Sequence, residues 1–339
     1  MKQRALALTL SLGLVLMFSS LASAQYQLTN LTANQSGVAT YTDPLLVNPW
    51  GLAYAPTGPF WVSDEASGWS TLYTGTGQPQ PTEVIVPSAD GTSPGTPTGI
   101  VYNASQQFQI EGWVSAFIFD TLDGTISGWS AFSPKAALIA VDNSASGAVY
   151  TGLAITNHTS NNHIYAADSW NNKVDVYDGN FKFVSSFTDS SLPAGFTPFG
   201  IQDIGGLVYV AFASNSGGPG GYIDIFSEAG KLVKRLAHGR PLNQPWGFAI
   251  APSNFGPLSN ALLISNNVDS GGTINAFNPK TGKFIGTISS SAGVPITIAG
   301  LWGIEFGGGS SKNGNTNQLF FTAGTDNETA GLFGVISAQ

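Results

Sequence analysis

Short runs of alternating apolar and polar residues, separated by turn residues, fill most of the chain and predict β-strands. Between residues 150 and 190, for example, the pattern predicts four strands joined by turns rich in Asn and Gly. These strands are expected at residues 152–156, 163–167, 173–177 and 183–187. No segment carries a sustained apolar period of 3.6 residues, so we expect little helix. The pattern therefore predicts an all-β fold.

The four-strand unit recurs along the chain. Six times a glycine preceded by an aromatic residue or Thr opens a short apolar strand, and successive glycines lie 48, 53, 48, 47 and 56 residues apart. A period near fifty residues with strands inside it indicates a β-propeller. Six units favour six blades over five or seven. We expect the blades to start near residues 48, 97, 150, 197, 244 and 299.

The sixth unit is one strand short. It predicts strands at residues 301–306, 318–322 and 332–336, and no fourth strand follows them. Residues 26–31 alternate polar and apolar side chains and can supply the missing strand. Such pairing would close the ring and cover an open sheet edge. We therefore expect residues 25–339 to form one six-bladed β-propeller whose last blade is closed by the N-terminal strand.

The first 24 residues have the pattern of a secretory signal. Lys2 and Arg4 precede an apolar run over residues 5–18, and Ala22-Ser23-Ala24 matches the small-x-small cleavage pattern. A membrane anchor is the alternative, but the run is shorter than the about 20 apolar residues that a spanning helix needs. We expect cleavage after Ala24, no membrane span in the mature chain, and a secreted or periplasmic location.

Composition narrows the classes of partner. The chain has no Cys, which excludes disulfides and thiolate metal sites. Without Lys2 and Arg4, ten basic residues face 20 Asp and Glu, a net charge of −10. This balance repels phosphate backbones and argues against nucleic acid. We expect a monomer whose partner is a small molecule, a glycan or a protein.

Residues 164–178 resemble an NHL repeat. An aromatic–apolar strand ends in Asp168, an Asn-rich turn follows, and Lys173 opens the next strand. With the segment Asn-Pro-Trp-Gly-Leu-Ala at 48–53, the mature chain resembles an uncharacterised family of secreted bacterial propellers in the six-bladed TolB-like group. The resemblance implies the fold and little about activity, because propellers host hydrolases, lyases, lectins and interaction modules alike.

Propeller geometry places two sets of residues around one mouth of the central channel. These are the residues before the repeated glycines and those after each second strand, and we name this side of the molecule the ring face. Aromatic side chains beside amides suit a sugar, another planar-faced ligand or a peptide. The alternative is that the aromatics only wedge the blades. The predicted ligand-binding residues are Trp50, Phe199, Trp246, Trp302, Asn215 and Asn267.

The ring face also carries hard oxygen ligands of the kind that bind Ca²⁺. Those predicted to bind it are Asp64, Glu65, Asp120, Asn266 and Asp326. Lactonase-like hydrolases on six-bladed propellers hold Ca²⁺ with such side chains, and that resemblance implies a cation that polarises an ester carbonyl. The alternative is structural, because an Asp that closes a second strand often caps the next turn. For Asp168 we favour the structural role.

Catalytic motifs give little support to an enzyme. There is no Gly-x-Ser-x-Gly elbow, and of the three His residues only His238 is placed to reach the ring face. We therefore predict a binding module without catalysis, and we assign no catalytic residue. The alternative is a Ca²⁺-dependent, lactonase-like hydrolase that uses Asp64, Glu65 and Asp120 with amides from Asn266 and Asn215.

Overall fold

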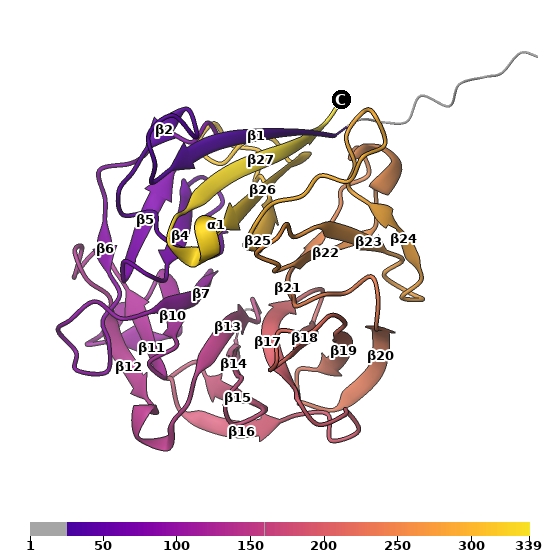
Figure 1. Ribbon diagram of the computed structural model, residues 1–339. Helices are drawn as coiled ribbons and strands as arrows, with labels where there is room; N and C mark the ends of the chain where they lie inside the picture. Colours follow the sequence, from indigo (N-terminus) through magenta and orange to yellow (C-terminus); the bar gives the residue numbers. More distant parts are fainter. Residues whose placement is uncertain (1–25, 159) are drawn as a thin grey trace, which may run out of the picture.

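The computed structural model describes residues 26–158 and 160–339, and the predicted signal sequence lies outside them. The strands form six blades around a central channel (Figure 1). The prediction of an all-β, six-bladed propeller is confirmed. Among the described residues, no helix is long and apolar enough to cross a membrane.

Each blade has its inner strand at the channel. The first contains β3 (Pro49–Tyr54), β4 (Phe60–Asp64), β5 (Trp69–Tyr73) and β6 (Val84–Ile85). The second contains β7 (Pro97–Tyr102), β10 (Phe117–Thr121), β11 (Thr125–Trp129) and β12 (Leu138–Asp142), with the hairpin β8 (Gln109–Ile110) and β9 (Trp113–Val114) inserted. The third contains β13 (Tyr150–Ile155), β14 (His163–Asp168), β15 (Lys173–Asp178) and β16 (Phe183–Phe187).

The remaining blades follow the same order. The fourth contains β17 (Phe196–Asp203), β18 (Leu207–Ser214), β19 (Tyr222–Ser227) and β20 (Leu232–His238). The fifth contains β21 (Pro245–Ile250), β22 (Leu262–Asn266), β23 (Ile274–Phe277) and β24 (Phe284–Thr287). The sixth contains β25 (Leu301–Phe306), β26 (Gln318–Ala323) and β27 (Leu332–Ala338), and the short helix α1 (Thr325–Glu328) lies between its last two strands.

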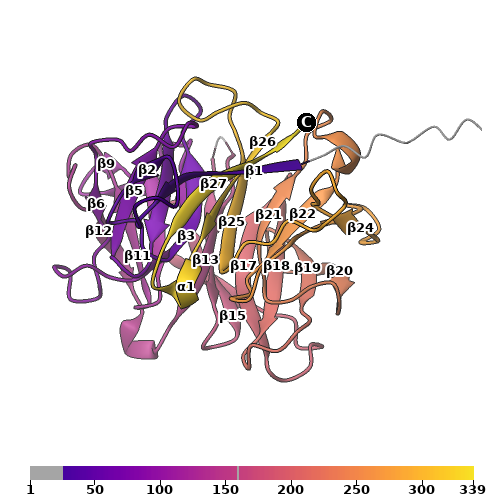
Figure 2. The ribbon, with the colours of Figure 1, turned by 45° about the horizontal axis from the view of Figure 1, so that its top comes forward.

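The fourth strand of the sixth blade comes from the other end of the described chain. β1 (Tyr26–Ala33) pairs antiparallel with β27, from Tyr26 opposite Ala338 to Ala33 opposite Leu332, and β2 (Tyr41–Thr42) extends the sheet beyond β1. The two strands run side by side in both ribbon views (Figure 2). β1 thus lies where the repeat pattern lacks a strand.

The hydrophobic core lies between the blades. Among the described residues, six apolar clusters each join one blade to the next around the ring. The interface between the sixth and first blades, for example, contains Phe60, Phe320 and Phe333. A seventh cluster sits on the channel axis. Burial of apolar surface between sheets is therefore what holds the ring together.

The repeated glycines permit neighbouring inner strands to approach closely at the channel. A Cβ added at Gly51 would lie 2.6 Å from the carbonyl oxygen of Thr98, and one at Gly152 would lie 3.0 Å from that of Phe199. At Gly303 the added Cβ would lie 2.7 Å from the carbonyl oxygen of Trp50. The six-fold glycine motif is thus a packing requirement at the channel wall.

We expect Gly200→Ala to destabilise the protein by about 1–3 kcal/mol, because its Cβ would overlap the Trp246 carbonyl in the next blade. Urea unfolding monitored by circular dichroism measures the loss. Gly218→Ala is the matched control, since its Cβ would find its nearest neighbour at 3.6 Å. Equal stability of the two variants would contradict the close-approach argument.

Candidate ligand-binding site

Three indoles from different blades meet at the channel axis. Trp50 stacks on Trp302 with 3.6 Å between ring centroids, and Trp246 meets them edge-on at 6.2 and 5.8 Å. Phe199 packs edge-on against Trp50 at 6.1 Å. We call these four residues the central aromatic cluster. The structure therefore brings together the four aromatic residues that the sequence placed on the ring face.

Burial corrects one expectation about this cluster. Trp50, Trp246 and Trp302 expose only 6, 8 and 2 % of their surface, so their ring faces contact one another and are not open. Two of the indole N–H groups donate inside the protein, Trp302 to Asn48 Oδ1 at 3.1 Å and Trp246 to the Thr151 carbonyl at 2.8 Å. These indoles are buried because large side chains from several blades point toward the same axis and fill the space there.

Phe199 and Asn215, by contrast, line an open pocket on the ring face. Its volume is about 570 Å³, and it lies over the starts of the inner strands and the ends of the second strands of neighbouring blades. Every lining residue is uncharged: Ser169, Trp170, Thr197, Phe199, Ala213, Ser214, Asn215, Gly217 and Gln244. We call this the ring-face pocket. It is the part of the predicted site that a ligand can enter.

Internal hydrogen bonds orient the amides of this pocket. Thr197 Oγ1 donates to Asn215 Oδ1 at 2.7 Å. Gln244 Nε2 donates to the carbonyl oxygens of Ser214 and Gly218 at 3.2 and 3.0 Å. Within the described residues, Asn215 Nδ2 and Gln244 Oε1 are left without a protein partner. The pocket therefore presents the Asn215 amide nitrogen as a donor and the Gln244 amide oxygen as an acceptor, both held in position by the protein.

Trp170 is the functional candidate that the sequence reasoning missed. It exposes 75 % of its surface at the edge of the ring-face pocket, far more than the 52 % of Trp113 or any other described Trp. It lies two residues after Asp168, in the turn between β14 and β15. A Trp in an otherwise polar, Asn-rich turn was the available signal.

The buried carboxylates among the predicted metal ligands are bound by the protein itself. Asp64 Oδ2 accepts from the Thr71 amide and hydroxyl at 3.1 and 2.7 Å. Asp120 Oδ1 accepts from the Gly99 amide at 2.6 Å and from Thr98 Oγ1 at 2.8 Å. Burial raises the pKa of Asp120 to about 7, and it also raises the pKa of Asp64. These bonds hold the turn and the inner strand.

Asp120 has counterparts in other blades that explain its role. Ser265 and Thr322 accept the amide hydrogens of Gly247 and Gly303 with their hydroxyl oxygens, just as Asp120 accepts that of Gly99. Asn266 Oδ1 accepts from the Asn243 amide at 2.7 Å. Asp168 accepts from the amides of Val149 and Asn171, as expected for a structural turn residue.

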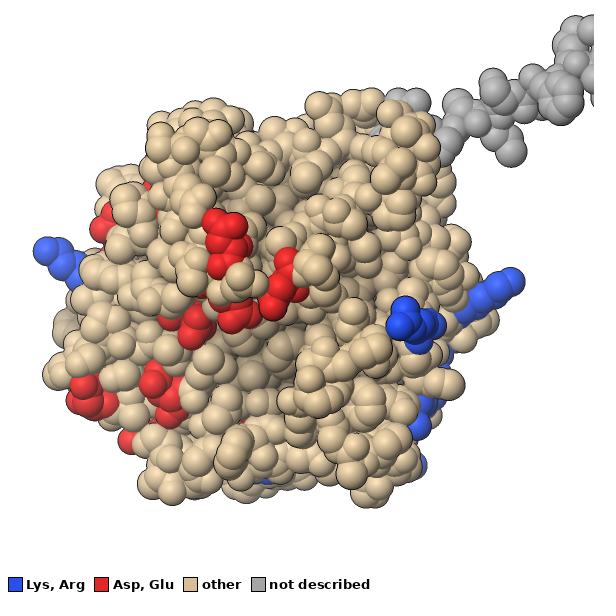
Figure 3. All heavy atoms as spheres, in the orientation of Figure 1, with Lys and Arg blue, Asp and Glu red and all other residues tan. Residues whose placement is uncertain are grey.

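Glu65 and Asp326 lie near the channel mouth but serve different contacts. Glu65 Oε2 accepts from Asn48 at 2.7 Å, and Asp326 Oδ2 accepts from Gln35 at 3.0 Å. Figure 3 shows acidic side chains gathered near the centre of this face, with α1 in the foreground of Figure 1. Burial is the main cause of the raised pKa of Glu65, and the charge of Asp123 adds to it.

The five predicted metal ligands do not form a compact ligand set. Among the residues that the structure describes, no three His, Asp or Glu side chains are grouped so that they could hold a metal ion. Asn267, the remaining predicted ligand-binding residue, lies outside the ring-face pocket, and its side-chain Nδ2 is buried without a partner in the described part of the chain. Within the described residues, Asp64, Glu65 and Asp120 of the hydrolase alternative are thus not grouped as a metal site.

Comparison with known proteins identifies homologues of undescribed function. The chain is 29 % identical over 337 residues to the uncharacterized protein R648 of Acanthamoeba polyphaga mimivirus. The aligned region covers 93 % of this chain and 81 % of that relative. It is 28 % identical over 335 residues to the uncharacterized protein L690 of the same virus, covering 92 % and 86 %. No family model matches, so the resemblance to secreted bacterial propellers rests on the residues alone.

Solved structures share the fold. A gluconolactonase from Xanthomonas campestris superposes with a TM-score of 0.57 at 12 % identity, covering 95 % of this chain and 93 % of that one. A virginiamycin B lyase from Staphylococcus aureus gives 0.54 at 13 % identity, covering 93 % and 99 %. At such low identity these similarities establish the six-bladed architecture and carry no statement about activity.

Proposed function

We propose that the chain is a binding module without catalysis that takes up a neutral, polyhydroxylated ligand, such as a glycan, in the ring-face pocket. The observation that carries the proposal is the exposed indole of Trp170 beside a pocket lined only by uncharged groups. This proposal keeps the predicted ligand class and moves its contact surface from the buried indoles to Trp170, Phe199 and Asn215.

The chemistry of the pocket matches that ligand class. A sugar presents an apolar C–H face that packs on an aromatic ring and hydroxyl groups that both donate and accept hydrogen bonds. Trp170 offers the ring, Asn215 Nδ2 offers a donor and Gln244 Oε1 an acceptor. A charged ligand would find no partner of opposite sign in this lining. Exposure of a single Trp is common in itself, and it is the position of Trp170 beside this uncharged pocket that favours a role in binding.

We expect Trp170→Ala to weaken binding of a matching oligosaccharide by about 30-fold, the effect of losing about 2 kcal/mol at a Trp hot spot. The probes are cello-, malto-, xylo- and chito-oligosaccharides, titrated by calorimetry against the mature protein. Intrinsic fluorescence gives an independent reading, because stacking of a sugar on an exposed indole shifts its emission.

Trp113→Ala is the matched control, because Trp113 is also exposed, at 52 %, and stacks on Phe132 away from this pocket. It should leave affinity unchanged. If Trp113→Ala weakened binding as much as Trp170→Ala did, or if no oligosaccharide of the panel bound, the glycan proposal would fail. If Trp170→Ala kept full affinity, the oligosaccharide would have to bind elsewhere on the protein and not in the ring-face pocket.

The proposal includes export of the protein as a monomer in the manner of the secreted TolB-like, NHL-like propellers. Its support is the leader pattern that ends at Ala24 and the start of β1 at Tyr26 directly after it. Cleavage there would release the folded part with only Gln25 ahead of its first strand. A secreted or periplasmic location would bring the ring-face pocket into contact with extracellular glycans.

A further inference from the structure

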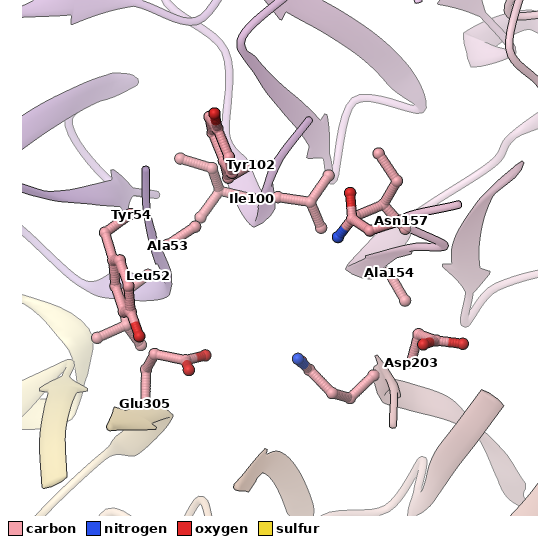
Figure 4. Close-up of a pocket in the computed structure, with 12 residues that line it drawn as sticks. Leu52, Ala53, Tyr54, Ile100, Tyr102, Ala154, Asn157, Asp203 and Glu305 are labelled. Atoms are coloured by element: carbon pink, nitrogen blue, oxygen red, sulfur yellow. The ribbon is translucent and has the colours of Figure 1, made fainter. Parts of the chain in front are cut away.

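A second cavity opens at the other end of the channel. Its volume is about 280 Å³, and it is lined by the C-terminal halves of inner strands, including Tyr54 of β3, Tyr102 of β7 and Glu305 of β25 (Figure 4). A narrow extension of about 30 Å³ continues inward to Trp246 and the repeated glycines. We call the cavity of about 280 Å³ the channel cavity. The central aromatic cluster therefore lies between the channel cavity and the ring face.

Glu305 is unusual in its position within the repeat. The residue two places after the repeated glycine is Ala or Val in four blades, Gln202 in the fourth blade and Glu305 in the sixth. Figure 4 shows the Glu305 carboxyl directed into the cavity, with the hydroxyl of Tyr54 beside it and Asn157 on the opposite wall. Within the described residues, no side chain or amide hydrogen-bonds or ion-pairs with the Glu305 carboxyl.

Among the residues that the structure describes, no positively charged side chain lines the channel cavity. Its titratable residues are Glu305, Tyr54, Tyr102 and Asp203, and the remaining polar groups are the amides of Asn157 and Gln202. Asp203 accepts from the Gly206 amide at 3.3 Å, and outside the cavity it faces Glu228 and His158. Apolar walls are formed by residues such as Leu52, Ile100 and Ile155. An unpaired carboxyl among aromatic and aliphatic side chains is complementary to a cation with an apolar body.

We propose that the channel cavity binds a small organic cation, an alkylammonium or quaternary ammonium compound, through Glu305. The ammonium group lies against the Glu305 carboxylate and the ring of Tyr54, and its alkyl groups contact Leu52 and Ile100. A cavity of this size, at the lower end of the about 300–1,000 Å³ common for ligand sites, accepts a molecule of few heavy atoms. This site is separate from the ring-face pocket and does not depend on the proposed glycan binding.

Proton linkage gives the proposal a pH signature. Burial raises the pKa of Glu305 to about 8, so at lower pH the empty cavity holds a protonated carboxyl. The cation needs the carboxylate, and its affinity should therefore rise by up to about tenfold per pH unit below pH 8 and level off above it. Burial raises the pKa of Tyr54 as well, which keeps its hydroxyl neutral throughout. Burial also raises the pKa of Asp203, and its carboxylate, where ionised, adds to the attraction of the cation in the same direction as that of Glu305.

The experiment uses choline and its uncharged isostere 3,3-dimethyl-1-butanol, titrated by calorimetry against the mature protein at pH 6, 7, 8 and 9. We expect choline to bind more tightly as the pH rises to 8, and the isostere to bind weakly with no pH dependence. Choline keeps its charge over this range, so the change reports on the protein.

Glu305→Gln keeps the shape of the side chain and removes its charge. We expect it to lose about 30-fold or more in choline affinity and to lose most of the pH dependence, which comes from the Glu305 carboxyl. Glu328→Gln is the matched control, because Glu328 belongs to the acidic side chains of the ring face and should leave choline binding unchanged. Equal binding of choline and the isostere to the unaltered protein, absence of choline binding at pH 9, or equal losses in the two variants would each overturn the proposal.

Discussion

A protein that begins after Ala33, and so lacks β1, is expected to lose its cooperative fold, whereas one that begins at Tyr26 should melt normally. β1 pairs with β27 at seven positions and buries Tyr26, Leu31 and Ala33. The Tyr26 hydroxyl also donates to the Phe255 carbonyl at 2.7 Å, which ties β1 to the fifth blade. Because a domain is stable by only about 5–15 kcal/mol, we expect the loss of a whole strand with three buried apolar side chains to be enough to unfold it.

Circular dichroism and size-exclusion chromatography measure this effect. The truncated protein should give no sharp thermal transition and should elute as aggregates. Without β1, the hydrogen-bonding edge of β27 and the apolar side chains beneath β1 would be exposed to solvent. Addition of a synthetic peptide of residues 26–33 during refolding should restore part of the transition. A truncated protein with a Tm within a few degrees of the longer one would show that β1 is dispensable.

Trp302→Ala is expected to lower the free energy of unfolding by about 3–5 kcal/mol, the cost of removing a buried Trp from a packed core. Trp302 stacks on Trp50 and packs against Trp246 and Phe199. Its removal would also leave Asn48 Oδ1 without its indole donor. Four partners therefore lose contact with one substitution.

Urea unfolding of Trp302→Ala beside Trp170→Ala provides the comparison. Trp170 is largely exposed, and its removal should change stability by less than about 0.5 kcal/mol. The pair of variants thus separates a Trp that holds the blades from a Trp that faces a ligand. Equal losses in both variants would contradict the distinct roles that we assign to them.

The sequence was sufficient for the fold because the repeat records a backbone requirement. Gly51, Gly200 and Gly303 recur where a neighbouring strand leaves no room for a Cβ, and that constraint can be read without any structure. The strand predicted at residues 26–31 is present as β1 (Tyr26–Ala33). Strand bounds differ by one or two residues: β27 continues to Ala338, two residues past the predicted end, and β13 begins at Tyr150, two residues before the predicted start.

The site was predicted less well, for two physical reasons. The sequence located Trp50, Trp246 and Trp302 on one face, but it does not give the width of the channel, and a narrow channel turns an open ring of indoles into a packed cluster. The sequence also does not show that Asp120 stands one residue earlier in the repeat than Asp64. Asp64 lies opposite Pro49, whereas Thr121 lies opposite Pro97, so the Asp120 carboxylate reaches the Gly99 amide.

Glu305 was overlooked for a different reason. It lies inside an apolar strand, where a single acidic residue is easily taken as solvent-facing. Alignment of the six units on their glycines isolates it, because the same position is small or apolar in most blades. Comparison of equivalent positions among blades is therefore more informative here than local motifs.

The pairing of β1 with β27 also sets the order in which the molecule can be built during synthesis. The first strand to leave the ribosome must wait for almost the last one, about 300 residues later, before it finds its partner. The first five blades can form in the meantime, since each is made of neighbouring segments, while β1 and the half-made sixth blade keep unpaired edges. A chain whose translation stops shortly before β27 would therefore have five complete blades. It would still be prone to aggregate through the unpaired strand edges of the sixth blade.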